Sequence, residues 1–130
     1  MDFIVGEKMK KKRIKVYIAG ALNSNAIGYI NNLHRMIFWS EKIRKLDVAV
    51  FVPGNDLLMG LVVGNYEYTD YFENSQPFLD VCDAIFLVPG WEKSKGTRRE
   101  IKRAEKKVIP VFDKLADFKK FLKGTKNTLY

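Results

Sequence analysis

Cys82-Asp-Ala-Ile-Phe-Leu-Val-Pro-Gly-Trp-Glu-Lys-Ser-Lys-Gly96 is the stretch that decides the fold of this chain. Its first part, Asp83–Val88, is a continuous apolar run that ends at a Pro-Gly pair. Such runs are typical of strands that are buried on both faces of a parallel sheet. Ser94, Gly96 and Thr97 then lead into a segment with helical spacing. The order of strand, loop and helix therefore predicts one unit of a parallel α/β sheet.

Three further apolar segments have the same character. Ile14–Ala19 is rich in β-branched residues, Asp47–Val52 also ends at a Pro-Gly pair, and Val108–Phe112 forms a fourth run. The likeness between residues 46–54 and 82–90 indicates two central strands with similar exits rather than a repeat protein. We therefore expect right-handed crossovers that leave helices on both faces of the sheet.

Segments with helical spacing separate these strands. The predicted helices span Ala26–Leu46, Tyr68–Val81, Thr97–Lys107 and Leu115–Leu122. Pro77 predicts a break or a late start in the second of them. Residues 55–65 fit either a short helix or a mobile flap.

The expected ligand site follows from this order of elements. Ligands of open parallel sheets bind outside the carboxyl ends of the strands. That rule brings together the predicted loops Gly20–Asn25, Pro53–Asp56 and Pro89–Gly96. Within the first two loops, the candidate binding residues are Gly20, Asn23 and Asn55.

Composition limits the partners. The 130 residues carry a formal net charge of +8, which favours anionic ligands. The single cysteine, Cys82, and the single histidine, His34, argue against a disulfide or a zinc site, so we expect no metal and a cytoplasmic protein. No apolar run is long enough to span a bilayer, so we expect no membrane partner. The basic ends favour solvated termini over a nucleic-acid arm, because no aromatic stacking platform accompanies them.

The loop Pro89–Glu100 holds most of the chemically informative residues. Gly90 and Gly96 permit close approach of the backbone to a ligand, and Trp91 offers a flat apolar face. Ser94 and Gly96 lead into a helix start, where free N–H groups bind anions. Lysine and arginine crowd this start against the helix dipole, and an anionic ligand would relieve their repulsion.

Glu100 has two interpretations. Thr97-Arg-Arg-Glu100 fits a capping box, in which the carboxylate only satisfies backbone N–H groups of the helix. Alternatively, the carboxylate points at whatever occupies the crevice. The pattern alone leaves both interpretations open.

Three segments resemble the nucleoside 2-deoxyribosyltransferase superfamily, including its small uncharacterised bacterial and phage relatives. They are Val16-Tyr-Ile-Ala-Gly20, residues 82–94, and the spacing Ser94-x-Gly96-x-x-x-Glu100, which a Pro-Val-Phe strand end at Pro110–Phe112 follows. The resemblance covers about residues 14–113. It implies a three-layer α-β-α fold with a flavodoxin-like or Rossmann-like parallel sheet of four to five strands. We expect one such domain over residues 14–123, after a basic lead-in at 1–13 and before a frayed tail at 124–130.

The resemblance also implies an activity, the cleavage or transfer of the N-glycosidic bond of nucleosides or nucleoside monophosphates. Glu100 would be the nucleophile, oriented by the Tyr17 hydroxyl. Ser94 and the Gly96 amide would hold a sugar hydroxyl or a 5′-phosphate, and Trp91 would stack on the base. No cofactor or metal is implied, and a homo-oligomer is expected because relatives assemble as dimers or larger rings.

One position departs from the pattern of that superfamily. The superfamily commonly has an Asp eight residues before Asp83, where this chain has Ser75, and Ser cannot replace Asp as an acid or base. Glu73 is close in sequence but would point elsewhere on a helix. The sequence therefore leaves two main hypotheses, a glycosidase or transferase and a non-catalytic nucleotide-binding or sensing module.

Overall fold

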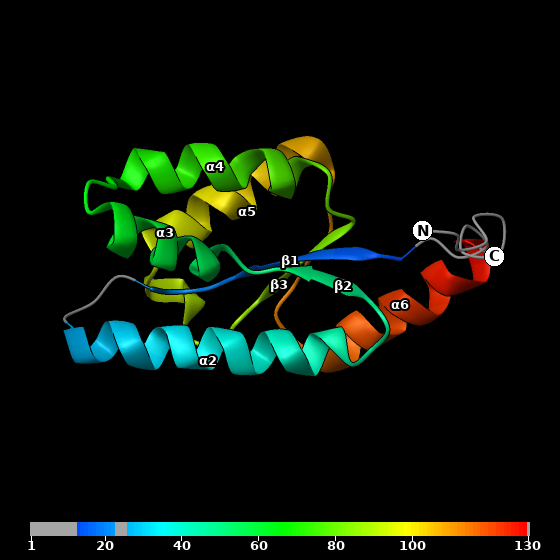
Figure 1. Cartoon of the computed structure of the whole chain (residues 1–130). Helices are drawn as coiled ribbons and strands as arrows, with labels where there is room; N and C mark the ends of the chain where they lie inside the picture. The colour runs from blue at the N-terminus through cyan, green and yellow to red at the C-terminus, as the bar shows by residue number, and fades with distance from the viewer. Residues whose placement is uncertain (1–12, 23–25, 130) are drawn as a thin grey trace, which may run out of the picture.

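The computed structural model describes residues 13–22 and 26–129, and a four-stranded parallel sheet forms its centre (Figure 1). The strand order is β2-β1-β3-β4. The strands are β1 (Lys15–Ala19), β2 (Ala49–Phe51), β3 (Ala84–Leu87) and β4 (Val111–Phe112). Tyr17 of β1 is in register with Phe51 of β2 and Ile85 of β3. This order is that of a flavodoxin-like sheet, in which the direction of winding reverses between β1 and β3.

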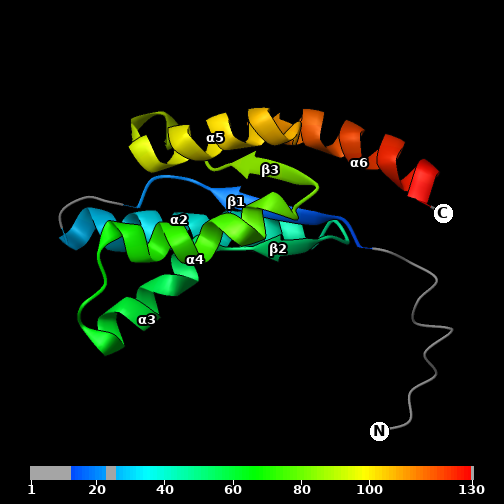
Figure 2. The same ribbon diagram turned by 90° about the horizontal axis from the view of Figure 1, so that it is seen from above.

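Helices cover both faces of the sheet, which gives three layers. They are α2 (Ala26–Arg44), α3 (Asp56–Val63), α4 (Tyr68–Asp80), α5 (Lys95–Lys107) and α6 (Leu115–Leu129), with short 3-10 turns η1 (Pro53–Asn55) and η2 (Trp91–Lys93). Helices α2 and α6 lie on one face, and α4 and α5 lie on the other (Figure 1). In the view from above, α3 lies at the outer edge of the molecule (Figure 2). None of the described helices is long and apolar enough to cross a membrane.

Alternation along the strands builds two cores. Val16 and Ile18 of β1 pack with residues of α2 and α6, whereas Tyr17 and Ala19 pack with residues of α4 and α5. Successive side chains of a strand point to opposite faces, so each strand between two helical layers must be apolar throughout. The predicted α/β class and parallel sheet are confirmed, and Tyr17 faces the layer that contains Glu100.

The interpretation of residues 47–52 as a central strand is wrong. β2 pairs only with β1 and lies at an edge of the sheet, so its three residues are only partly buried. The apolar spacing of the first predicted helix also does not mark the side of the helix that is buried. Ile30, Ile37 and Phe38 are exposed, while Met36 and Ile43 are buried. The helix carries more apolar residues than one helix face can bury, so spacing alone did not identify the buried stripe.

Two segments are more helical than the sequence predicts. α4 runs through Pro77 without a break. Pro77 has no N–H to donate to the Glu73 carbonyl. Both residues lie on the exposed side of the helix, so this carbonyl is not left unpaired in the core. α6 continues to Leu129, so residues 124–129 are not a frayed tail. A single glycine such as Gly124 costs a helix only about 1 kcal/mol, which is too little to end it.

Residues 55–65 contain the helix α3 instead of a flap. The predicted lead-in at residues 1–12 and the last residue, Tyr130, lie outside the part of the chain that the structure describes. Arg13 is described, and its guanidinium forms a 2.9 Å ion pair with the Asp47 carboxylate.

Candidate active site

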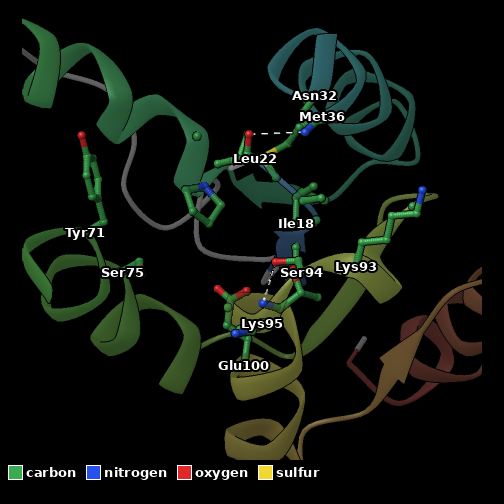
Figure 3. A pocket seen from close by; sticks show the side chains of 18 of the residues that line it. Ile18, Leu22, Asn32, Met36, Tyr71, Ser75, Lys93, Ser94, Lys95 and Glu100 are labelled. Carbon is green, nitrogen blue, oxygen red and sulfur yellow. Dashed lines mark hydrogen bonds between the residues drawn. The ribbon is translucent and has the colours of Figure 1, made fainter. Parts of the chain in front are cut away.

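A cavity of about 1020 Å³ opens at the carboxyl ends of the strands (Figure 3). Gly20 after β1, Gly54 after β2 and Gly90 after β3 all line it. The three loops that the sequence predicts to meet do therefore meet. Helices α2, α4 and α5 close the sides, and the labelled side chains of Asn32, Ser75 and Glu100 approach the space from these three helices.

Two of these glycines are required by their surroundings. A Cβ atom on Gly20 would lie 3.0 Å from the Val88 Cβ, which is tighter than an ordinary contact, so a larger residue would force Val88 to shift. Gly90 has a φ of +93°, which glycine adopts without steric cost. Both glycines therefore shape the mouth of the cavity through the backbone.

Glu100 lies on the side of α5 that faces the cavity, and its carboxylate accepts a hydrogen bond from the Tyr17 hydroxyl. Burial raises the pKa of Glu100 to about 7, while the Tyr17 hydrogen bond opposes that rise by stabilising the charged form. The carboxyl group can therefore exist in either protonation state near neutral pH. Perturbed pKa values of this kind are typical of groups at functional sites.

Tyr17 is fully buried behind Glu100 and stacks on Phe51, with 5.5 Å between the ring centroids. Burial, followed by the charge of Glu100, raises the pKa of the Tyr17 hydroxyl far above its usual range, although the nearby Ser75 hydroxyl acts in the other direction. The hydroxyl therefore stays protonated and acts as a fixed donor to Glu100.

The capping-box interpretation of Glu100 is wrong. α5 begins at Lys95, earlier than predicted, and Ser94 is its N-cap, with the Thr97 N–H donating to the Ser94 Oγ at 3.1 Å. Ser94 precedes Thr97 by three positions, which is the spacing by which Thr97 precedes Glu100 in the predicted capping box. Glu100 consequently lies in the second turn of the helix, and its described hydrogen bond is to Tyr17 rather than to the helix backbone.

Thr97 was placed at the helix start by the sequence, but its side chain was not among the predicted site residues. Its side chain is 1% exposed, it lines the cavity, and its Oγ1 has no hydrogen-bond partner among the described residues. Leaving a buried hydroxyl without a partner costs about 1–3 kcal/mol. Together with the lining residues Ser94, Lys95 and Gly96, it offers hydrogen-bonding groups at the amino end of α5.

The side chains that line the cavity carry an excess of positive charge. Four of the described lining residues are cationic and two are acidic: Arg35, Lys93, Lys95, Arg99, Asp56 and Glu100. The cations gather near the amino end of α5, where the helix dipole is also positive. An anionic group such as a phosphate ester would be attracted to this end of the cavity.

The predicted stacking role of Trp91 is wrong. Trp91 does not line the cavity and packs instead against the core cluster that contains Ala104. The 3-10 turn η2 directs its ring onto the protein. The aromatic lining comes from Tyr29 on α2 and from Tyr71 and Phe72 on α4, and no local sequence pattern marks these residues.

The remaining candidates are distributed as follows. Asn23 lies outside the described residues, and Asn55 belongs to η1 with its side chain outside the described part of the chain. Ser75 is 7% exposed and lines the cavity, whereas Glu73 is exposed to solvent, as its helical position predicted. Asp56 also lines the cavity, and the sequence placed its loop there without singling out this residue.

Cys82 and His34 lie away from this cavity. Burial raises the pKa of the Cys82 thiol to about 11, so this cysteine stays protonated at neutral pH. No group of three or more potential metal ligands occurs among the described residues.

The fold and the cavity define an α/β protein with a cationic cavity at the switch point of a parallel sheet. A family model for a domain of unknown function, DUF4406, matches residues 14–113, and the chain belongs to this family. A comparison with curated proteins finds no match.

Proposed function

We propose that this protein cleaves or transfers the N-glycosidic bond of a nucleoside or nucleoside monophosphate, as the resemblance to the 2-deoxyribosyltransferase superfamily implies. One observation carries this proposal. Glu100 is a cavity carboxylate whose pKa lies near 7 and whose orientation is fixed by the Tyr17 hydroxyl. A carboxylate in this setting is suited to attack an electron-poor anomeric carbon.

The reaction would proceed in two displacements. An ionised Glu100 oxygen bonds to C1′ as the bond from C1′ to the base breaks, through a transition state with oxocarbenium character. A water molecule or a second base then displaces the carboxylate. Tyr17 keeps the carboxylate aimed at the cavity in both steps, so Tyr17 is a positioning residue.

The amino end of α5 supports a phosphorylated substrate. Ser94, Gly96 and Thr97 line the cavity there, close in sequence to the cavity-lining cations of the same loop and helix. A 5′-phosphate at this end would receive hydrogen bonds from the helix start and from the Thr97 hydroxyl, which otherwise has no partner among the described residues. The aromatic side chains of Tyr29 and Tyr71 would then lie toward the base.

A second candidate function is a nucleotide-binding or sensing module without catalysis. Ser75 favours it, because a hydroxyl stands where the superfamily commonly has an acid. Binding of monophosphates without release of base would support the sensor.

The test is base release from a panel of deoxynucleosides and their 5′-monophosphates, followed by chromatography. We expect free base with wild type and none above background with Glu100→Gln. The matched control is Glu105→Gln, an exposed carboxylate on the same helix, which should retain full activity. If wild type releases no base, or if Glu100→Gln is as active as wild type, the glycosidase proposal is wrong.

We also propose that the protein forms a homo-oligomer and that it is cytoplasmic. Four apolar side chains of α2 are at least half exposed: Ile27, Ile30, Ile37 and Phe38. An exposed apolar stripe of this kind supports a homo-oligomer. Light scattering coupled to gel filtration should give a mass above that of one chain.

A further inference from the structure

Asp56 is the second carboxyl group of the cavity. Among the described lining residues only Asp56 and Glu100 are acidic, and they come from different helices, α3 and α5. Asp56 is only 7% exposed. Aspartate is almost never buried to this degree without a partner or a role, because removal of a carboxylate from water is costly.

Two features fix the Asp56 carboxylate. The Asn74 side-chain amide on α4 donates to Asp56 Oδ2 at 3.2 Å, which ties the start of α3 to α4. Asp56 is also the first residue of α3, so the helix start fixes its backbone position. Among the residues that the structure describes, no side chain is seen to hydrogen-bond to Oδ1, so this oxygen is available to a ligand.

Glycosidic cleavage requires a group of this kind. When the bond from C1′ to the base breaks, the electron pair moves onto the base, and a proton donor must neutralise the developing charge. Glu100 cannot serve, because it is bonded to C1′. Ser75 cannot serve either, because an alcohol is too weak an acid, and its hydroxyl already donates to the Phe72 carbonyl at 3.4 Å.

We propose that Asp56 is the proton-transfer carboxylate of this cavity, an inference that rests on the proposed glycosidic activity. In the reactive complex of this proposal the two carboxyl groups share a single proton, which lies on Asp56 while Glu100 is ionised. The bond from Glu100 to C1′ forms, the bond from C1′ to the base breaks, and the Asp56 proton goes to a base nitrogen. In the second step ionised Asp56 removes a proton from water as its oxygen bonds to C1′ and releases the Glu100 carboxylate. The same residue therefore acts first as acid and then as base.

A substrate that needs no acid distinguishes this role from a structural one. A purine deoxynucleotide methylated at N7 already carries a positive base, which leaves as a neutral molecule without protonation. With Asp56→Asn, we expect kcat/KM for the unmethylated purine deoxynucleotide to fall roughly 100-fold or more. The first turnover of the methylated substrate should slow less than tenfold.

The second step then becomes the slow one in the variant. Asp56→Asn should release about one methylated base per protein in a rapid burst, and intact mass spectrometry should detect the sugar phosphate bound to the protein. Wild type should show no burst. Glu73→Gln, a solvent-exposed carboxylate beside Asn74, is the matched control and should behave as wild type.

The outcomes separate the two proposals. If wild type is active and Asp56→Asn slows both substrates equally, or slows neither, Asp56 is not the proton-transfer group while the glycosidase proposal stands. If wild type releases base from neither substrate, both proposals are wrong. Should Asp56→Asn fail to fold, Asp56→Ser carries the same comparison, because Ser is also favoured at helix starts.

Discussion

The Tyr17 hydroxyl donates a hydrogen bond to the Glu100 carboxylate across 83 positions of sequence. Tyr17 lies in a central strand of the sheet, and Glu100 lies on a helix that packs over it. This bond connects the carboxylate to the most buried part of the molecule. The position of Glu100 therefore depends on the sheet and not on the loops around the cavity.

Substitution Tyr17→Phe should shift the pH dependence of activity. Phe keeps the stacking on Phe51 but removes the hydrogen bond that lowers the pKa of Glu100, so this pKa rises above about 7. The acid limb of the kcat/KM profile should move to higher pH. A hydrogen bond to a charged group contributes about 1.5–3 kcal/mol, so activity at pH 6 should fall roughly 10- to 100-fold. An unchanged profile in a folded variant would show that Tyr17 does not tune Glu100.

Substitution Glu100→Gln should stabilise the protein at alkaline pH. The pKa of Glu100 is raised in the fold from 4.5 to about 7. The folded state therefore binds this proton more tightly, and the associated stability is present below pH 4.5 and is lost as pH rises through 7. Gln does not ionise, so the variant does not lose this stability as pH rises.

Urea unfolding of both proteins measures this difference. At pH 8 the free energy of unfolding of Glu100→Gln should exceed that of wild type by an amount on the order of 2–3 kcal/mol, and the gap should close toward pH 4.5. Glu105→Gln should show no such trend. A gap that is independent of pH would contradict burial of the ionised carboxylate.

Substitution Thr97→Val should separate stability from binding. Val has the shape of Thr without the hydroxyl that lacks a partner among the described residues, so the melting temperature should not fall and is expected to rise. KM for a 5′-monophosphate should rise about tenfold relative to KM for the matching nucleoside. Equal changes in the two KM values would exclude a contact between Thr97 and the phosphate.

Two glycine substitutions should have opposite signs. Gly20→Ala places a methyl group 3.0 Å from the Val88 Cβ, which cannot retreat without a shift of the chain after β3, and should destabilise the protein by about 1–3 kcal/mol. Gly124→Ala meets nothing within 4 Å in α6 and should stabilise it by up to about 1 kcal/mol. Denaturant midpoints of the two variants measure this, and a stabilising Gly20→Ala would contradict the close packing there.

The α/β class and the location of the site could be predicted from the sequence because both depend on local patterns. Apolar runs such as Asp83–Val88 mark buried strands, and a parallel sheet brings the loops at their ends together. The local pattern around Glu100 left its role open, and only the family resemblance implied that its carboxylate belongs to the site.

What the sequence missed depends on helix rotation and on contacts between distant segments. Tyr71 and Arg35 reach the cavity from helix faces whose phase local spacing did not fix. Trp91 was assigned to the ligand because a turn does not reveal which way a side chain will point. Asp56 lay within a predicted loop, but its burial and its bond to Asn74 appear only once α3 and α4 are in place.

The central claim is that Glu100 bonds covalently to a sugar, and a slowed substrate tests it most directly. A purine nucleotide with 2′-fluoroarabinose destabilises the oxocarbenium-like transition states, so a glycosyl-enzyme that forms should persist. We expect the protein mass to increase by one sugar phosphate and peptide mapping to locate the addition at Glu100. Two results would contradict the account. One is an unchanged protein mass with the fluorinated nucleotide, although the protein releases all of the base from the natural substrate. The other is an addition at a residue other than Glu100.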